Sequence, residues 1–328
     1  MRQSVTVCVL AWSLAAPGLS RQSAETYGDW SAPTNVGPPV NIAGSNDMYA
    51  ILSRDELTMY FTSNRPEGLG GDDLWFVTRE AADAPWGDPQ NLTALNSSDA
   101  DSLPVLSSDE HVMFFHSTRP GCGAGDIWMA RRQDRRSQVW DPPVDLECGV
   151  VNTAAIEIAP AFFENPETGQ VTLFYGSNRT GSQGFDVYAS PVGEDGYFGP
   201  GEKVPEFSSP GRDTRIFIRR DGLEAFITSD RPGGQGLLDI WTSTRETLSD
   251  PWPRTSIDVP SPVNSACEDG SPWLSRDGTT LYFFSTRTGG LQCGKRDVWY
   301  ATRPKVKQEN PIQAIAGRFN RMLARLTG

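Results

Sequence analysis

The sequence has 328 residues, of which 10% are aromatic, and a formal net charge of −12. This length permits one large all-β domain or two domains of ordinary size. An acidic surface repels phosphate backbones, so we expect no nucleic acid partner; a cation or a basic protein surface fits better. The 32 glycines and 25 prolines, together with the aromatic residues, favour many short strands over long helices.

Residues 1–20 have the pattern of a signal peptide. Arg2 supplies a positive start, and the apolar run from Val5 to Ala16 is too short to span a bilayer. Gly18 and Ser20 are small residues suited to cleavage after Ser20. The alternative is a ragged terminus with a chance apolar run. We therefore predict a periplasmic or secreted protein without a transmembrane segment, in which residues 21–29 form a linker.

Five copies of one pattern occupy residues 30–303, which we predict to form one domain. Each copy has an acidic residue, an apolar run ending in Ser-x-Arg, a Gly-rich stretch and an Asp-apolar-aromatic triplet. The acidic residues are Asp47, Asp101, Glu157, Asp213 and Asp269, and the arginines are Arg65, Arg119, Arg179, Arg231 and Arg287. The triplets begin at Asp73, Asp126, Asp186, Asp239 and Asp297. The acidic residue stands 18 positions before the arginine in four copies and 22 before it in the third.

The repeat length of 52 to 60 residues is that of one four-stranded propeller blade. In each copy, strand a begins at the acidic residue, strand b is the apolar run, and strand c begins at the Asp triplet. Strand d follows an aromatic residue in four copies: Trp86, Trp140, Phe198 and Trp252. Strand b is apolar on both faces, as expected for a strand covered by neighbouring blades. We predict an all-β, five-bladed β-propeller with four antiparallel strands per blade.

The fifth copy stops near Arg303, before its strand d. The unmatched segment at the front, from Trp30 to Ile42, contains Pro39-Val40-Asn41-Ile42, which is similar to the strand d segment around Gln90-Asn91-Leu92. We expect this N-terminal segment to supply the outer strand of the last blade, because closing the ring removes exposed sheet edges.

The block from Asp269 to Gly278, followed by Leu281 to Arg287, resembles the WD40-like repeat of the TolB propeller family. The resemblance covers about residues 30–303 and implies a scaffold in the cell envelope that binds another envelope protein or a ligand such as a carbohydrate. We expect a monomer that is not an enzyme. The alternative is a glycosidase-like enzyme that uses carboxylates at the channel mouth, since some five-bladed propellers are glycosidases.

The five acidic residues of the repeat should form a ring at the mouth of the central channel. Like charges repel at short range, so the ring needs a counter-charge. A Ca²⁺ or Mg²⁺ ion held by these oxygen atoms is one solution, and we regard the five residues as candidate metal ligands. The other solution is pairing with the five Ser-x-Arg arginines, which are also our candidate binding residues on this face.

Four cysteines lie beyond the signal peptide, in two pairs each 26 residues apart. An even number in an exported chain predicts disulfides, and we expect Cys122–Cys148 and Cys267–Cys293. The strand c aspartates should fasten the loops between strands b and c. His111 and His116 are too few for a His-rich metal site, so we expect packed or surface roles. Apolar residues at helical spacing in 304–328 predict a short docked helix, or alternatively a basic amphipathic segment.

Overall fold

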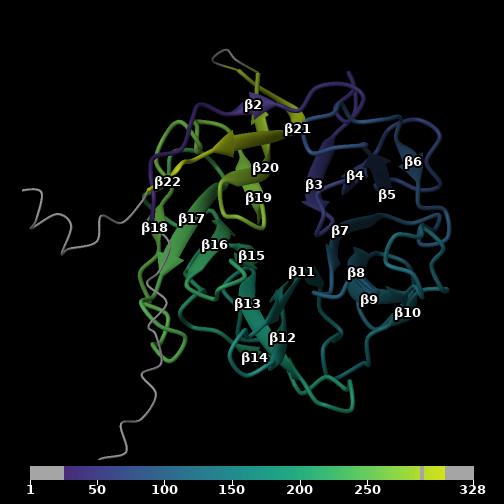
Figure 1. Ribbon diagram of the computed structural model, residues 1–328. Coiled ribbons are helices and arrows are strands. Elements are labelled where there is room, and N and C mark those ends of the chain that lie inside the picture. The colour runs from purple at the N-terminus through teal and green to yellow at the C-terminus, as the bar shows by residue number, and fades with distance from the viewer. Residues whose placement is uncertain (1–25, 289–291, 307–328) are drawn as a thin grey trace, which may run out of the picture.

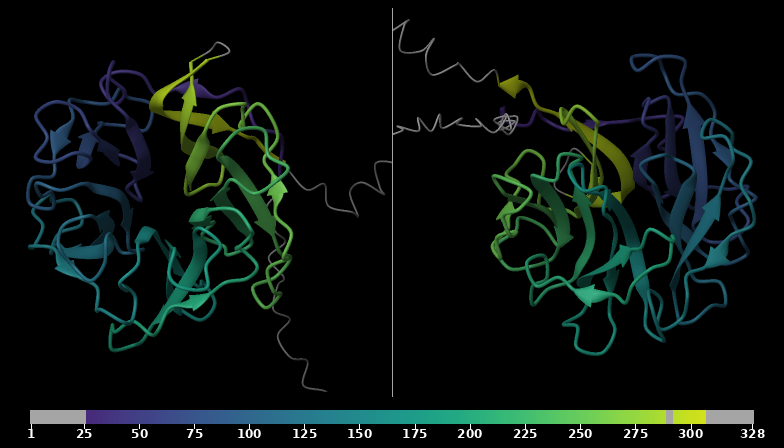
Figure 2. Two further views of the ribbon diagram at one scale, coloured as in Figure 1. Left: turned by 180° about the vertical axis from the view of Figure 1, so that it is seen from behind. Right: turned by 60° about the horizontal axis from the view of Figure 1, so that its bottom comes forward.

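The computed structural model describes residues 26–288 and 292–306, and within these ranges every regular element is a β-strand. Five four-stranded antiparallel sheets form a ring (Figure 1), which Figure 2 shows from behind and tilted. The predicted all-β, five-bladed propeller is confirmed. The predicted signal peptide and most of the predicted tail helix lie outside the described residues. Among the described residues, no helix is long and apolar enough to cross a membrane.

Each of the first four blades is a meander in which strand order in the sheet follows strand order in the chain. The first blade comprises β3 (Asp47–Leu52), β4 (Thr58–Ser63), β5 (Asp73–Thr78) and β6 (Gln90–Asn91). The second comprises β7 (Asp101–Leu106), β8 (Val112–Ser117), β9 (Asp126–Arg131) and β10 (Val144–Asp145). The third comprises β11 (Glu157–Glu164), β12 (Val171–Ser177), β13 (Asp186–Val192) and β14 (Glu202–Lys203). The fourth comprises β15 (Asp213–Ile218), β16 (Glu224–Ser229), β17 (Asp239–Thr244) and β18 (Ile257–Asp258).

The fifth blade joins the two ends of the propeller. It contains β19 (Asp269–Leu274), β20 (Thr280–Arg287) and β21 (Cys293–Thr302), with β2 (Thr34–Asn35) as its outer strand. The register pairs Thr34 with Tyr300 and Asn35 with Trp299. Closure by the N-terminal segment is therefore confirmed. A further two-stranded sheet pairs β1 (Thr26–Tyr27) with β22 (Lys305–Val306).

The closing strand lies earlier in the segment than the similarity to Gln90-Asn91-Leu92 suggested. Residues Val40 and Asn41 follow the strand and correspond to Leu95 and Asn96 of the first blade. The Asn41 side chain donates to the carbonyl of Val298 at 2.9 Å and accepts from the Val298 amide at 2.9 Å. The side-chain amides of Asn96, Asn152 and Asn264 make the same pair of hydrogen bonds to strand c of their blades. This clasp fixes the connection that leads into the next blade.

The cores lie between blades, because strand b presents apolar side chains on both of its faces. On β4, Tyr60 is 1% exposed and packs in a cluster with Phe115 of the second blade. Its neighbour Phe61 is 0% exposed and packs on the other side with Val298 of the fifth blade. Successive residues of a strand point to opposite faces, so one strand contributes to two cores. The innermost strands β3, β7, β11, β15 and β19 surround the centre of the ring (Figure 1).

Candidate functional site at the channel mouth

Each acidic residue of the predicted ring is buried and bound by the arginine of its own blade. In the second blade, Arg119 Nη2 lies 2.6 Å from Asp101 Oδ1, and Arg119 Nε donates to Ser117 Oγ at 2.8 Å. The Arg119 guanidinium also lies 4.9 Å from the ring centroid of Trp128 on strand c. The Ser-x-Arg triplet therefore connects strands a, b and c of one blade.

The other four blades repeat this arrangement. The ion-pair distances are 2.7 Å for Arg65–Asp47, 3.2 Å for Arg179–Glu157, 2.6 Å for Arg231–Asp213 and 2.6 Å for Arg287–Asp269. The carboxylate side chains are 0% exposed and the arginine side chains 6 to 16% exposed. Arginine supplies the counter-charge for which a cation was the alternative. Among the described residues, no group of three potential metal-ligating side chains comes together.

The strand c aspartates fasten the b–c loops in the first four blades. The Gly123 amide donates to Asp126 at 3.0 Å, for example, and the Gln235 amide donates to Asp239 at 2.8 Å. Asp297 of the fifth blade is different: it is half-buried and accepts from Asn35 Nδ2 at 2.9 Å. It lines a cleft of about 360 Å³ together with Lys295, Arg287, Trp299, Thr288 and Asn35. Burial raises the pKa of Asp297, which a bond from Asn35 partly offsets.

The residue type differs from blade to blade at three positions: two are near the ring acid, and one precedes the strand c aspartate. The residues before the ring acids are Asn46, Ala100, Ile156, Arg212 and Glu268. Those two positions after the ring acids are Tyr49, Leu103, Ala159, Arg215 and Ser271. Those before the strand c aspartates are Asp72, Gly125, Phe185, Leu238 and Arg296. The second and third blades carry no charge at any of these positions, whereas the first, fourth and fifth do. A catalytic pair of carboxyl groups needs this kind of asymmetry, because its two members take different roles.

Arg296 is the centre of this asymmetric group. Its Nη2 lies 2.8 Å from Glu268 Oε2, and its Nη1 donates to the Tyr49 hydroxyl at 3.2 Å. The Arg296 side chain is 30% exposed and that of Glu268 is 26% exposed, so both reach solvent. Phe284 also contacts this group: its ring packs edge-on against the Tyr49 ring, with the two ring centroids 5.5 Å apart. Arg296 thus joins the fifth blade to the first at the channel mouth.

Asp72 and Arg215 complete this group, which we call the mouth cluster: Tyr49, Asp72, Arg215, Glu268 and Arg296. Burial raises the pKa of Asp72, although Arg296 acts in the opposite direction. Burial also raises the pKa of Tyr49, and both arginines lower it. The charges of the other four members of the mouth cluster all act on the pKa of Tyr49, so Tyr49 lies within electrostatic range of each of them. Asp72 and Glu268 both act on the pKa of Arg296, and two carboxyl groups in different environments around one arginine are an arrangement suited to proton transfer.

Sequence reasoning missed the mouth cluster because it searched for what the five copies share. Asp72 immediately precedes the repeated Asp73, and Glu268 immediately precedes the repeated Asp269. A signal was present: aligning the copies and looking for charged exceptions would have found Asp72, Glu268 and Arg296. Their meeting across the closing blade depends on the ring, which brings the first and fifth copies together.

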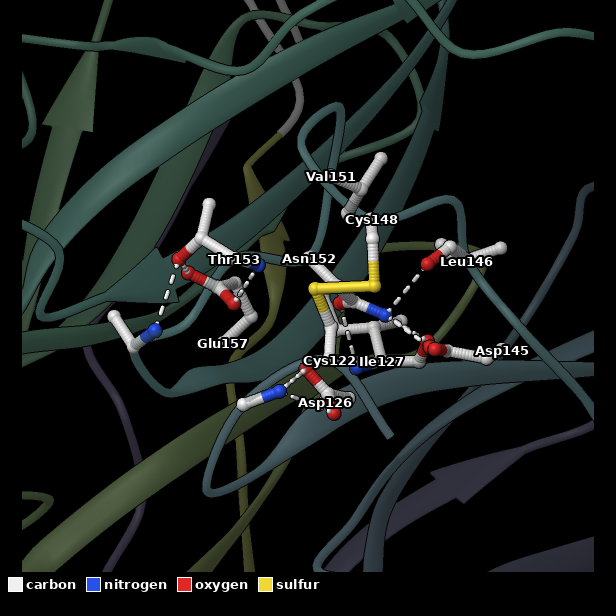
Figure 3. The surroundings of a disulfide bond; sticks show 12 residues. Cys122, Asp126, Ile127, Asp145, Leu146, Cys148, Val151, Asn152, Thr153 and Glu157 are labelled. Carbon is white, nitrogen blue, oxygen red and sulfur yellow. Dashed lines mark hydrogen bonds between the residues drawn. A yellow bond between two sulfur atoms is a disulfide. The ribbon is translucent and has the colours of Figure 1, made fainter. Parts of the chain in front are cut away.

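Two disulfides lie on this face of the ring. Cys122 is joined to Cys148 and Cys267 to Cys293, each with Cα atoms 5.6 Å apart, and these are the pairs expected from the sequence. Figure 3 shows that Cys148 belongs to the connection that carries Asn152 and Thr153. Disulfides persist outside the reducing cytosol, so the chain is an exported protein.

The two histidines make contacts with the protein. His111 Nδ1 lies 3.0 Å from the carbonyl oxygen of Arg132. His116 Nδ1 lies 3.2 Å from Ser102 Oγ, and its Nε2 is buried without a partner. Burial lowers the pKa of His116 to about 4, against the opposing influence of Asp101. His116 is therefore neutral at pH 7.

No family model and no curated protein matches this chain. Solved structures do. The catalytic domain of a Coprinopsis cinerea GH62 α-L-arabinofuranosidase has a TM-score of 0.54 at 11% identity, covering 84% of this chain and 96% of its own. An endo-arabinase from Bacteroides thetaiotaomicron has a TM-score of 0.54 at 11% identity, covering 81% and 95%. An α-L-arabinofuranosidase from Lactobacillus brevis has a TM-score of 0.54 at 10% identity, covering 84% and 94%. At these identities the likeness shows the fold.

These findings overturn the resemblance to the WD40-like TolB family, and with it the interpretation as a TolB-like, protein-binding scaffold of the envelope. The similar structures are five-bladed propellers of glycoside hydrolases, and no family model supports the TolB assignment. The physical reason is visible in the blade. The Ser-x-Arg triplet, the ring acid and the strand c aromatic hold one blade together, as Arg119 does with Asp101 and Trp128. Such a pattern is what a stable blade needs, so it indicates the propeller fold and does not identify a family.

Proposed function

We propose that this chain is an exported carbohydrate-active enzyme, a glycoside hydrolase that acts at the channel mouth and works in the periplasm or the surrounding medium. The observation that carries the proposal is the mouth cluster, in which two carboxylates outside the Arg-paired ring, Asp72 and Glu268, gather around Arg296. The similar propellers from Coprinopsis cinerea and Bacteroides thetaiotaomicron, which bear the names of arabinose-releasing and arabinan-cleaving enzymes, support the choice of carbohydrate as substrate.

The five ring carboxylates are unsuited to this chemistry. Each has 0% side-chain exposure and is bound by an arginine, so none is accessible to a sugar. The enzyme hypothesis therefore depends on other carboxylates, which must differ from blade to blade. Glycoside hydrolysis needs one protonated acid and one ionised carboxylate, in two different environments.

Asp72 and Glu268 have such different environments. Burial raises the pKa of Asp72, which favours the protonated form that can donate to the leaving glycosidic oxygen. Glu268 lies 2.8 Å from Arg296, and in the proposed reaction it would accept the proton of a water molecule that attacks the anomeric carbon. Tyr49 and Arg296 supply hydrogen-bond donors for sugar hydroxyls.

The cleft that contains Asp297 belongs to the same surface. Lys295, Arg296 and Asp297 are consecutive: Arg296 belongs to the mouth cluster, and its two neighbours line the cleft. Asn35, Lys295 and Asp297 offer both donors and acceptors, as recognition of sugar hydroxyls requires. We propose that this cleft binds part of the glycan chain adjacent to the reacting bond.

The test is release of reducing sugar from arabinan, arabinoxylan and other plant polysaccharides by the purified mature protein. We expect activity on at least one of them, and a loss of 100-fold or more in kcat for Asp72→Asn and Glu268→Gln, the order of magnitude that one acid or base contributes. Asp83→Asn, on an exposed loop, is the matched control and should keep full activity. Full activity in both mouth variants would refute the assignment. Glycan binding without any cleavage would refute hydrolysis and leave a lectin-like protein.

A further inference from the structure

The third residues of the innermost strands differ from blade to blade. They are Tyr49, Leu103, Ala159, Arg215 and Ser271, each two positions after a ring acid. In four blades this residue has a positive φ, of 59° at Tyr49, 59° at Leu103, 53° at Ala159 and 55° at Ser271. The fourth blade differs, because its register shift lies between Asp213 and Arg215. It also differs chemically, since it carries a cation, Arg215, two positions after its ring acid.

Arg215 is a buried cation without an ion-pair partner among the described residues. The residue is 4% exposed. Its Nη2 donates to the Pro104 carbonyl of the second blade at 3.2 Å, so the side chain extends across the ring. Its Nη1 is fully buried and has no acceptor within residues 26–288 and 292–306. Withdrawing a guanidinium from water without a compensating charge costs several kcal/mol, which makes the missing acceptor at Nη1 a conspicuous gap.

Two residues that also stand two positions after a ring acid have hydroxyl groups that lack an acceptor. The Ser271 hydroxyl, in the next blade, is buried without a partner. The Tyr49 hydroxyl, one blade further, accepts from Arg296 at 3.2 Å, and its own proton has no acceptor in the part of the chain that the structure describes. Arg215 and Tyr49 are close enough for each to alter the pKa of the other. Donors without acceptors, contributed by three consecutive blades, define an environment that favours an anion.

We propose that the centre of the ring binds one small monovalent anion of halide size between Arg215 Nη1 and the hydroxyls of Ser271 and Tyr49. One guanidinium balances one negative charge. The burial of Nη1 favours a compact ion such as chloride over a carboxylate carried by a glycan. Burial lowers the pKa of Arg215 to about 10, so the side chain keeps its charge at neutral pH. Arg215 and Tyr49 also belong to the mouth cluster, but the test of the anion site needs no substrate, so its outcome is separate from that of the proposed hydrolysis.

Thermal unfolding of the mature protein in sodium chloride, sodium bromide and sodium gluconate at equal ionic strength provides the first test. Chloride and bromide should raise the Tm along a saturating curve, by about 4 °C at a hundredfold excess over Kd, because the ion binds only the folded state. Gluconate is too large for an enclosed site and should give no saturating rise. A crystal soaked in bromide should show an anomalous peak beside Arg215 Nη1.

Variants locate the effect. Arg215→Met should abolish the halide response, and Ser271→Ala should weaken the halide affinity several-fold. Arg212→Met is the matched control: Arg212 is exposed and three positions away in the chain, so its removal should leave the response intact. If Arg215→Met does not fold, three results still test the proposal: the melting curves of the unsubstituted protein in the three salts, the anomalous bromide peak, and the halide affinity of Ser271→Ala. Identical curves in chloride and gluconate, no bromide peak at Arg215, or a halide response that survives Arg215→Met would each overturn the proposal.

Discussion

Arg296 Nη1 lies 3.2 Å from the Tyr49 hydroxyl, although the two residues stand 247 positions apart in the chain. The contact connects the first blade to the fifth, where the ring closes. The same guanidinium binds Glu268 at 2.8 Å, so one side chain both bridges the seam and orients a carboxylate at the channel mouth. Closure of the propeller and assembly of the proposed active site are therefore linked through Arg296.

The Arg296–Glu268 pair is partly exposed, so we expect a modest contribution to stability. A double-mutant cycle with Arg296→Gln and Glu268→Gln, followed by chemical denaturation, should give a coupling free energy of about 1 kcal/mol at low salt. The coupling should fall at 1 M salt, where exposed charges are screened. A coupling free energy of zero at low salt would contradict the ion pair.

The ring ion pairs should matter much more. Arg119→Met leaves the fully buried Asp101 carboxylate without its counter-charge, and we expect a loss of about 3 to 5 kcal/mol in the free energy of unfolding. Arg254→Met is the surface control, because Arg254 is 76% exposed and 3.8 Å from Glu206, and it should change stability by less than about 0.5 kcal/mol. Equal effects of the two substitutions, measured by denaturant unfolding, would contradict a structural role for the ring.

Added divalent cations should leave the melting temperature unchanged. Each ring carboxylate already has an arginine, so millimolar Ca²⁺, Mg²⁺ or EDTA should shift the Tm of the mature protein by less than about 1 °C. A saturable rise with Ca²⁺ that Asp101→Asn with Asp269→Asn abolishes would instead establish a cation at the ring.

Closure of the ring by the N-terminal segment can be tested by removing the hydrogen bonds between Asn41 and Val298. Asn41→Ala removes two hydrogen bonds to Val298 and leaves buried backbone groups unpaired, so the expected loss is about 2 kcal/mol. Asn96→Ala removes the same bonds inside a blade made of continuous chain and serves as the matched comparison. We expect similar losses, and deletion of residues 21–45 should lower the melting temperature sharply. A neutral Asn41→Ala beside a costly Asn96→Ala would mean that the ring is open.

His116 should make the fold sensitive to mild acid. Burial lowers the pKa of His116 to about 4, below the ordinary value of 6.5 that it regains on unfolding. The unfolded chain therefore takes up the proton first as the pH falls. The stabilisation is complete above about pH 6.5 and is lost between there and pH 4, by up to about 3 kcal/mol. His116→Thr, which places the residue of the first and fourth blades at this position, should remove this part of the pH dependence in denaturant melts at pH 7, 5.5 and 4.

The sequence by itself determined the blade. A strand that is apolar on both faces, a Ser-x-Arg end and an Asp-led strand c recur because every blade must bury two faces and fix one loop. Local bonds such as Arg119 to Ser117, two residues apart, follow directly from such a repeat. The missing last strand also predicted closure by the front of the chain, since a propeller cannot leave one blade without its outer edge.

Tertiary structure alone decided what the repeat leaves undetermined. The choice between arginine and a cation for the ring acids depended on side-chain reach, and the guanidinium of Arg287 lies 2.6 Å from Asp269. The outer strand of the fifth blade fell at Thr34–Asn35 because Asn41 was needed for the clasp to Val298. The mouth cluster escaped prediction because Asp72 and Arg296 belong to the first and last copies, which only ring closure makes neighbours. A repeat encodes what its copies share, whereas a site is made from the differences that closure brings together.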